Sequence, residues 1–579
     1  MRKWLLHASA LFTVSTALAS CAPAAAPEQD AALAGQVDAL FLAQIRPDTP
    51  GCAVGVYRKG EIVLARGYGV ASLEDGRPIT PRSAFNLGSA SKPFTTLAVF
   101  LLEQSGRLSM DDDVRKWMPE LPDYGSPIRV RDLLQHTTGL RDFETLQVLS
   151  ARPVANGAEF LGLMAAQRAL NFDPSTTHEY SHSDYGLLGL IVERAAGVPF
   201  GEHMQRTVFG PLGMAGTFVD DGGAGARKDR AVGHSTTPRG LAVHFPSSQT
   251  FGGDNVYTSI DDLARWDRNF SSPTVGTAAM MARMASRPTL ANGDTIPYAF
   301  GLRVDTYRGL RTVLRGGHPA GMQAWFMRFP DQEFTVATLC NSDNLEAFRF
   351  SEGVADLYLA SVLTPVSARP PAPAAVTMTT QELQRYSGIY RSVDDPWDLL
   401  PIEVRNGGLG EVLFDDAADE TFFPMTPAGD GRFFEIGTTG NVGIFVFRAP
   451  AVGTPLRLDV SWNGRSVEVM ERVPDAEVWR PSTAALLEYS GAWFNPDLGA
   501  AWQFEARGDR LVWRRRGQPD LTVRPVTRDR FLRGLGVDSA VSVRMHFTRD
   551  SAGRLTELVV STPPGEDSVQ NLRFVRLPK

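Results

Sequence analysis

Apolar and polar residues alternate in two widely separated parts of the chain. Residues 53–71, AVGVYRKGEIVLARGYGVA, alternate on both sides of Lys59-Gly60, which is typical of a β-hairpin. Residues 321–341 contain a second pair of such runs, which turns at Pro330-Asp331. The segments between them carry apolar residues at helical spacing. Strands at both ends with helices between them predict an α+β domain, in which the first and last strands meet in one antiparallel sheet flanked by helices.

The pattern changes after residues 364–379, TPVSARPPAPAAVTMT, a proline- and alanine-rich stretch that is typical of a linker. Beyond it, short alternating runs separated by glycine turns replace the helical period. The sequence LQRYSGIY from Leu383 recurs as LLEYSGAW from Leu486. We therefore predict two copies of one small all-β, barrel-like unit, at residues 380–479 and 480–579.

The N-terminus has the layout of an export signal. Two basic residues precede an apolar run, and small residues lead to Cys21 in LASC, which resembles the lipobox of bacterial lipoproteins. On this interpretation residues 1–21 form a lipoprotein signal peptide, Cys21 is lipidated, and residues 22–33 form a flexible tether. Ordinary cleavage within APAAAPEQ is the alternative. We expect an exported, periplasmic protein that contacts the membrane through an N-terminal lipid anchor.

Two further cysteines, Cys52 and Cys340, would lie in an oxidising compartment if the chain is exported. They can form a disulfide if their strands are neighbours. The alternative is two separately buried thiols, and the sequence leaves both arrangements open.

The composition of the 579 residues excludes some classes of protein. A hydrophobic content of 43% with 21% charged residues is ordinary for a globular protein. The formal net charge of −7 offers no basic excess, so we expect no nucleic-acid partner. Nothing in the sequence points to a cofactor, and we expect none.

The segment FNLGSASKPFTTLAVFLLEQSG carries the main candidate chemistry. From Phe94 its apolar residues follow a helical period up to Gly106. Ser89 and Lys92 stand three apart at the start of this helix, so both side chains project from one face. Burial of a lysine among apolar residues lowers its pKa, which suits it to act as a general base toward a serine. Lysine is rare in this chain, which favours a specific role for Lys92.

Several ordered matches strengthen this Ser-x-x-Lys signal. GRLSMDDDVRKWMPELP, VRDLLQHTTGLRDF and GGDNVYTSIDDLARWDRN resemble segments of the serine β-lactamase and penicillin-binding protein superfamily, in particular the branch of class C β-lactamases, esterases and D-aminopeptidases. The resemblance implies a β-lactamase-like serine hydrolase domain, which we assign to residues 34–363, with Ser89 as nucleophile and Lys92 as base. The β repeats resemble the lipocalin-like accessory barrels of D-aminopeptidase-like members.

Residues 178–182 read HEYSH, which matches the His-Glu-x-x-His zinc signature. A zinc protease needs both histidines on one helix face, whereas the helical pattern begins only after this segment, with Ser183 or Asp184 as N-cap. We therefore predict no metal site. The resembling branch carries Tyr-x-Asn at this place. Tyr180 is then the expected catalytic tyrosine, which can take the proton of Ser89 Oγ or pass one to the leaving group. His182 replaces the usual asparagine in substrate binding, and an imidazole titrates near neutrality.

RGGHPAGMQAW stands where the branch has its third motif, Lys-Thr-Gly or His-x-Gly, on a strand edge. Arg315 cannot act as an acid or base, but it can bind a substrate carboxylate through two parallel hydrogen bonds. Gly316 and Gly317 would let a substrate lie along the strand. The resemblance also implies an oxyanion hole made by the backbone N–H groups of Ser89 and His318.

Together these residues predict a serine hydrolase that works through an acyl-enzyme on Ser89. The expected substrates are small: D-amino-acid peptides, β-lactams or esters. The alternative is a catalytically weak lipoprotein that keeps the fold and binds or senses cell-wall peptides. The departures at His182 and Arg315 favour this alternative, whereas the intact Lys92 and Tyr180 oppose it.

Overall fold

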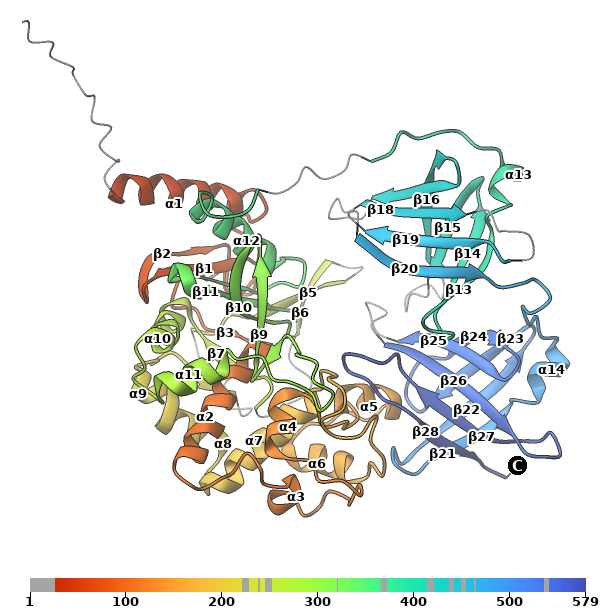
Figure 1. Ribbon diagram of the computed structural model, residues 1–579, viewed down its shortest axis with the longest axis horizontal. Helices are drawn as coiled ribbons and strands as arrows, with labels where there is room; N and C mark the ends of the chain where they lie inside the picture. Colours follow the sequence, from red (N-terminus) through yellow and green to blue (C-terminus); the bar gives the residue numbers. More distant parts are fainter. Residues whose placement is uncertain are drawn as a thin grey trace, which may run out of the picture.

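The computed structural model (Figure 1) describes residues 26–220, 229–237, 240–244, 252–319, 321–365, 372–413, 421–436, 442–448, 454–462, 465–535 and 541–578. The predicted signal peptide and Cys21 lie outside these residues. Within them, no helix has both the length and the apolar character needed to cross a lipid bilayer.

A seven-stranded antiparallel sheet forms the centre of the N-terminal domain, in the order β2-β1-β12-β11-β10-β9-β8. As predicted, the strands that come first and last in the sequence of this domain meet in one sheet, because β1 pairs with β12. The predicted hairpin is β1 and β2, which turn at Lys59 and Gly60, both with positive φ. The strands are β1 (Cys52–Arg58), β2 (Glu61–Tyr68), β8 (Tyr298–Ala299), β9 (Leu302–Tyr307), β10 (Leu310–Gly317), β11 (Gln323–Phe329) and β12 (Phe334–Cys340).

The pairing of β1 with β12 places Cys52 opposite Cys340. Their sulfur atoms are bonded, and both residues are fully buried. Of the two arrangements that the sequence left open, the structure therefore has the disulfide. It joins residues 288 positions apart in the sequence, and so links β1 to β12, which come first and last in the sequence among the strands of this sheet.

Successive residues of β1 face two different cores, as the two-residue period of a strand requires. Val54 and Val56 pack in a core with α1 (Ala26–Leu42) and α12 (Ala347–Tyr358), whereas Ala53 lies in a larger core with the other helices. Those helices are α2 (Lys92–Gln104), α3 (Val114–Trp117), α4 (Val130–Gln135), α5 (Phe143–Ser150), α6 (Gly157–Ala165), α7 (His182–Ala196), α8 (Phe200–Met204), α9 (Gly210–Leu212), α10 (Ile260–Ser271) and α11 (Ala278–Met284). Short strands complete the domain: β3 (Phe85–Asn86), β4 (Phe218–Val219) and β7 (Val256–Thr258) in one sheet, and β5 (Gly233–Thr237) with β6 (Gly240–His244) in another.

Helix α1 corrects the expected N-terminal tether. The sequence predicted a flexible segment over residues 22–33, but the helix begins at Ala26. Its second half is anchored, since Phe41 is fully buried and stacks on Tyr68 and Phe350. The alanine-rich composition that suggested a tether also favours a helix, because alanine has the highest helix propensity.

Two closed, eight-stranded antiparallel barrels follow the N-terminal domain (Figure 1), which confirms the predicted pair of all-β units. Large apolar side chains pack their interiors, among them Phe433, Phe445 and Phe447 in the first barrel and Trp493 and Trp513 in the second. The first barrel consists of β13 (Gly388–Ser392), β14 (Leu399–Arg405), β15 (Gly408–Leu413), β16 (Thr421–Gly429), β17 (Arg432–Ile436), β18 (Val442–Arg448), β19 (Arg457–Trp462) and β20 (Arg465–Arg472). The second consists of β21 (Gly491–Asn495), β22 (Ala500–Arg507), β23 (Arg510–Arg515), β24 (Leu521–Thr527), β25 (Arg530–Leu535), β26 (Val541–Arg549), β27 (Leu555–Ser561) and β28 (Leu572–Arg576).

The sequence repeat marks the start of each barrel. Its leucines, Leu383 and Leu486, are buried in two short helices, α13 (Thr380–Leu383) and α14 (Thr483–Leu487). Its glycines, Gly388 and Gly491, begin the first strands with φ values of 150° and 133°. Side chains disfavour this conformation, so each copy keeps a glycine where the chain enters the barrel.

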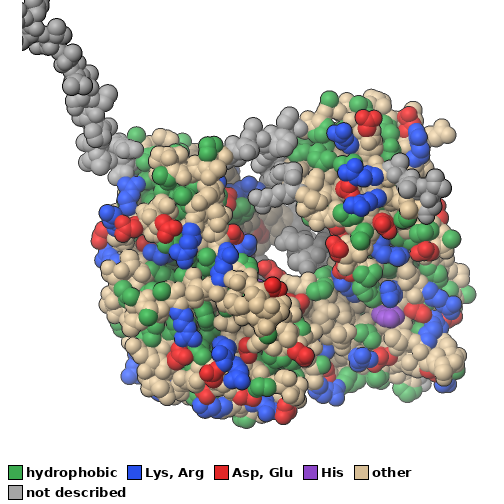
Figure 2. Space-filling model, in the orientation of Figure 1, with side chains coloured by type: hydrophobic (Ala, Val, Ile, Leu, Met, Phe, Trp, Pro, Cys, Tyr) green, Lys and Arg blue, Asp and Glu red, His purple; other side chains and the backbone are tan. Residues whose placement is uncertain are grey.

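The second barrel packs against the N-terminal domain beside α5 and α6 (Figure 1). Trp502 of β22 is buried and donates its Nε1–H to the carbonyl of Leu149 at 3.1 Å. The buried guanidinium of Arg141 donates to Asp497 at 3.1 Å. Figure 2 shows the two parts in continuous contact in its lower half, with basic and acidic side chains interspersed over the visible face. This contact brings the loop between β27 and β28, residues 562–571, to the site described next.

Candidate active site

Ser89 lies in a 3-10 turn that leads directly into α2. The turn depends on Gly88, which has φ of +50° and no room for a side chain, because a Cβ would lie 2.6 Å from Pro319. Ser89 Oγ is 3.0 Å from Lys92 Nζ and 2.8 Å from the hydroxyl of Tyr180. The structure therefore brings together the three side chains that the sequence nominated for catalysis.

Lys92 is fully buried at the base of the site. Its ammonium group donates to Ser89 Oγ and to the carbonyl of Gly253 at 3.1 Å. The same group lies 5.1 Å from the centroid of the Tyr180 ring and 5.6 Å from that of Tyr185. These contacts give the buried amino group polar partners and place it beside the ring of Tyr180.

Positive charges near Tyr180 favour the loss of its proton. Arg315 Nη2 donates to the Tyr180 hydroxyl at 2.6 Å. Burial alone would raise the pKa of Tyr180, but the charges of Arg315, Lys92 and His182 outweigh this effect and lower the pKa below its usual value. A phenolate at this position can accept the proton of Ser89 Oγ.

Arg315 makes contacts within the protein that the sequence did not predict. The sequence suggested a carboxylate-binding guanidinium, but its Nε donates to the carbonyl of Ser89 at 3.0 Å while Nη2 donates to Tyr180. The guanidinium also lies over the rings of Tyr180 and Tyr298, at 5.0 and 5.4 Å from their centroids. Both bonded nitrogens thus serve the catalytic tyrosine and the nucleophile turn. Burial opposes the charge, but the neighbouring tyrosines raise the pKa of Arg315, which stays cationic.

Gly316 and Gly317 are required by packing inside the protein. A Cβ on Gly317 would lie 1.9 Å from the carbonyl oxygen of Leu87, and one on Gly316 would lie 2.3 Å from the ring of Trp325. Gly317 therefore lets the end of β10 approach the Ser89 turn, and Gly316 leaves room for the Trp325 ring and also lines the cavity over Ser89. This approach brings His318 to the cavity that Ser89 lines. Burial and then the charge of Arg315 lower the pKa of the His318 side chain.

The first four residues of HEYSH lie before α7, but its last residue, His182, is the first residue of the helix, which therefore begins earlier than predicted. The predicted N-caps are wrong by two residues or more, since Ser181 is the N-cap and its side chain accepts the N–H of Ser183. Glu179 binds the second barrel, through the N–H of Gly565 and the hydroxyl of Ser568. In the part of the chain that the structure describes, two groups of side chains have metal-ligand proximity, and neither contains His178: Asp142, His182 and Asp567, and Glu144, His182 and Asp254.

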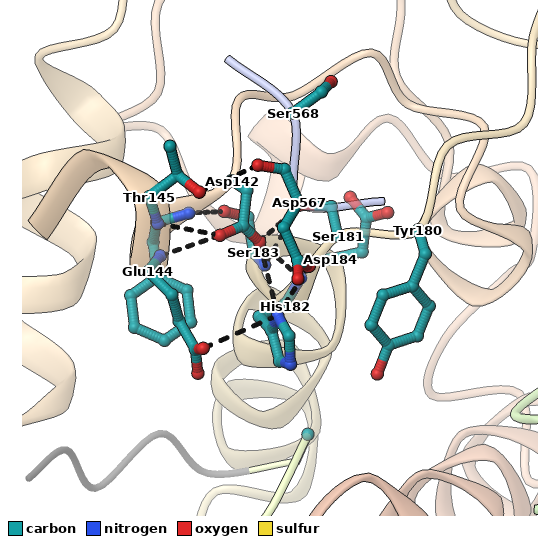
Figure 3. A network of polar contacts seen from close by, with 12 residues as sticks. Asp142, Glu144, Thr145, Tyr180, Ser181, His182, Ser183, Asp184, Asp567 and Ser568 are labelled. Carbon is teal, nitrogen blue, oxygen red and sulfur yellow. Dashed lines mark hydrogen bonds and ion pairs between the residues drawn. The ribbon is translucent and has the colours of Figure 1, made fainter. Parts of the chain in front are cut away.

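His182 lies among carboxylates (Figure 3). Its Nδ1 is 3.0 Å from Asp567 Oδ1, 3.5 Å from Asp142 Oδ2 and 3.9 Å from Glu144 Oε2. Burial alone would lower the pKa of His182, but Glu144, Tyr180 and Asp567 raise it well above its usual value. The ring is therefore an imidazolium at neutral pH, and not the near-neutral titrating group that the sequence suggested.

The carboxylates around His182 were not predicted. Asp142 is the N-cap of α5 and accepts the N–H groups of Glu144 and Thr145. Burial raises the pKa of Glu144 to about 7. An aspartate with a glutamate two residues later, directly after LLQHTTGLR, is a local signal that could have identified this helix start. Asp567 belongs to the second barrel, and no local signal connects it to the site.

A cavity of about 470 Å³ opens over the nucleophile. Acidic side chains of Glu144, Glu566 and Asp567 line it together with the basic side chains of Arg303 and Arg315. The remaining lining residues are Ser89, His178, Tyr180, His182, Pro297, Tyr298, Gly316 and His318. The cavity therefore offers charges of both signs to a small substrate, and the second barrel supplies part of the acidic side.

His136, Asp184 and Tyr298 form a second layer of polar residues next to Tyr180. His136 is fully buried, with Nδ1 2.9 Å from Asp184 and Nε2 3.0 Å from the hydroxyl of Tyr298. Its ring lies 4.5 Å from that of Tyr180. Burial lowers the pKa of His136 and raises that of Asp184, so it disfavours the charged form of each residue. His136 lies in the LLQHTTGL segment, but the sequence assigned it no role.

Comparisons with known proteins agree with this geometry. The family model described as Beta-lactamase matches residues 32–360, which is more than half of the chain. The chain therefore belongs to the β-lactamase family. At the level of the family, it is a serine hydrolase related to penicillin-binding proteins and D-aminopeptidases.

Among its relatives, penicillin-binding protein 4* of Bacillus subtilis is 27% identical over 398 residues, which cover 65% of this chain and 85% of the relative. A D-aminopeptidase of Gluconobacter oxydans is 26% identical over 297 residues, which cover 50% of this chain and 56% of the relative. The chain thus spans little more than half the length of that enzyme. The octameric penicillin-binding protein homologue from Pyrococcus abyssi shares the fold, with a TM-score of 0.54 at 20% identity over 76% of this chain and 99% of that one.

Proposed function

We propose that the chain hydrolyses amide or ester bonds through an acyl-enzyme on Ser89. The observation that carries the proposal is the position of Ser89 Oγ, 2.8 Å from the hydroxyl of Tyr180 and 3.0 Å from Lys92 Nζ. Arg315 and Lys92 lower the pKa of this tyrosine against the effect of burial, which is what a general base for a serine requires.

The reaction begins when Ser89 Oγ attacks the substrate carbonyl carbon. The phenolate of Tyr180 takes the serine proton as the new C–O bond forms, and the negative charge moves to the carbonyl oxygen. We assign the backbone N–H groups of Ser89 and His318 to this oxyanion, since both residues line the cavity. The bond to the leaving group then breaks, and the Tyr180 hydroxyl returns its proton to the leaving nitrogen or oxygen. In the second half, water attacks the acyl carbon of the ester while Tyr180 takes the water proton. The bond between the acyl carbon and Ser89 Oγ then breaks, Tyr180 returns the proton to Ser89 Oγ, and the acid leaves.

The proposed substrates are peptides or amides with a free amino group and a D-residue at the bond that is cleaved. Glu566 offers a carboxylate to such an ammonium group at the wall of the cavity. The similarity to D-aminopeptidases supports the choice of D-residues. The volume of about 470 Å³ suits a short peptide rather than a long polymer.

A direct test compares D- and L-alanine p-nitroanilide with the purified full-length chain. We expect hydrolysis of the D-isomer, its loss in Ser89→Ala, and no effect of a chelator. Equal rates for both isomers would contradict the proposed stereochemistry. Hydrolysis that survives in Ser89→Ala, or that the chelator abolishes, would contradict the acyl-enzyme itself.

We also propose that the chain is exported and anchored through a lipid on Cys21. The disulfide between Cys52 and Cys340 supports an oxidising compartment. Replacing Cys21 with serine should move the protein from the membrane fraction to the soluble fraction of the periplasm. Retention of that variant in the membrane fraction would count against the anchor.

A further inference from the structure

The loop between β27 and β28 is bound by its main chain to the N-terminal domain. Asp567 N donates to the carbonyl of Tyr180 at 2.9 Å, and Asp142 N donates to the carbonyl of Ser568 at 3.0 Å. Thr145 Oγ1 donates to the carbonyl of Asp567 at 2.8 Å. On the side of the loop, these contacts involve only the backbone. They therefore hold position 567 beside the site independently of the side chain that it carries.

The carboxylate of Asp567 meets one edge of the His182 ring (Figure 3). Its Oδ1 is the nearest of three carboxylate oxygens to Nδ1, at 3.0 Å. Because Nδ1 faces the carboxylates, Nε2 lies at the opposite edge of the ring. His182 lines the cavity, so Nε2 is the nitrogen that can donate to a substrate there. Asp142 Oδ2 lies farther from Nδ1, at 3.5 Å, and it also accepts the backbone N–H of His182.

We propose that Asp567 is a positioning residue of the hydrolytic site: it holds the His182 ring beside Tyr180 with Nε2–H directed to the substrate, so that the second barrel is part of the catalytic apparatus. The inference rests on the proposed function and goes beyond it, because it assigns a task to a residue of the other domain.

The chemistry of histidine explains why such a partner is needed. An asparagine, the residue that the family usually carries here, has two N–H bonds on one nitrogen and needs no partner to donate one of them. A neutral imidazole carries its single N–H on either nitrogen, and the ring can turn over. A carboxylate at Nδ1 fixes both the orientation of the ring and a permanent N–H at Nε2, as carboxylates do for histidines in metal sites.

The first test observes the contact directly in the full-length chain. Two-bond ¹H–¹⁵N spectra of the imidazole nitrogens are recorded for the native protein, and the signals that vanish in His182→Asn are assigned to His182. We expect Asp567→Asn to move the His182 signals. Ser568→Ala is the matched control, because it removes the neighbouring loop contacts to Glu179 and Asn171 but leaves the Asp567 carboxylate in place. His182 signals that are identical in the native protein and in Asp567→Asn would overturn the proposal.

The second test asks whether Asp567 acts through His182 in catalysis. We expect Asp567→Asn to lower kcat/KM for a D-amino-acid p-nitroanilide about tenfold, the usual effect of weakening a charged hydrogen bond to a substrate. In a His182→Asn background the same change should have less than about a twofold effect, because the ring that Asp567 holds is absent. A loss that came only from undocking of the barrel would be equal in both backgrounds, and equal losses would overturn the proposal.

Labelling of Ser89 by a fluorophosphonate separates this inference from the proposed function. Labelled Ser89 in every variant, with equal losses in the two backgrounds, would overturn the role of Asp567 alone. A native chain whose Ser89 is not labelled would overturn the proposed function, while the imidazole spectra would still decide whether Asp567 holds His182.

Discussion

Replacing Arg315 with glutamine should raise the pKa of Tyr180 and move its catalytic titration to higher pH. The guanidinium donates to the tyrosine hydroxyl at 2.6 Å and is the strongest of the charges that lower this pKa. The phenolate is the proposed base, so activity rises as pH passes upward through the pKa of Tyr180. Raising that pKa therefore shifts the acidic limb of the profile to higher pH.

The magnitude follows from the charges involved. Two unit charges about 4 Å apart interact by about 4 kcal/mol at an effective dielectric constant of about 20, which corresponds to about 3 pKa units. Lys92 and His182 remain in place in the variant and continue to favour the phenolate. We therefore expect the limb to move by about 2 units, and activity below the limb to fall about a hundredfold.

The assay is the pH dependence of kcat/KM for p-nitrophenyl acetate, a neutral ester without a carboxylate that Arg315 could bind. Arg315→Lys is the matched control: it keeps the positive charge but cannot make both hydrogen bonds, so its limb should stay within about 1 unit of the native one. A profile for Arg315→Gln that falls uniformly, with its acidic limb unmoved, would refute the assignment of Arg315 to Tyr180.

Three further predictions concern the framework of the site. Reducing the disulfide between Cys52 and Cys340 should cost about 2–5 kcal/mol of unfolding free energy, seen as a lower denaturant midpoint, and an unchanged midpoint would contradict its stabilising role. Gly317→Ala should fold, as judged by circular dichroism, but lose fluorophosphonate labelling, because its Cβ would lie 1.9 Å from the carbonyl oxygen of Leu87 and displace the nucleophile turn; full labelling would contradict this. Trp502→Ala should destabilise the chain by about 3–5 kcal/mol and expose the second barrel to limited proteolysis, and native-like resistance would show that the barrel docks without this side chain.

The grouping of Ser89, Lys92 and Tyr180 could be predicted because each residue lies in a short local motif. Ser89 and Lys92 are three residues apart at a helix start, and Tyr180 lies two residues before the first residue of another helix. The sheet could be predicted for a similar reason, since its hairpins alternate with a strict two-residue period and turn at recognisable residues such as Lys59-Gly60.

The electrostatics of the site could not be predicted in the same way, because they depend on contacts between distant segments. The pKa of His182 is raised by Glu144, by Tyr180 and, from the second barrel, by Asp567. The contacts of Arg315 depend on how closely β10 approaches Tyr180. A motif shows which side chains occur but not which partners surround them. For this reason the sequence suggested a titrating histidine and did not reveal the carboxylates that surround it, nor the hydrogen bond from Arg315 to Tyr180.

The claim that Ser89 is an activated nucleophile is tested most directly by intact-mass spectrometry of the full-length chain after treatment with a fluorophosphonate. The account predicts a single adduct that maps to Ser89, persists with a chelator, and disappears in Ser89→Ala. A folded native chain that acquires no adduct would contradict the account and favour a protein that binds cell-wall peptides without cleaving them.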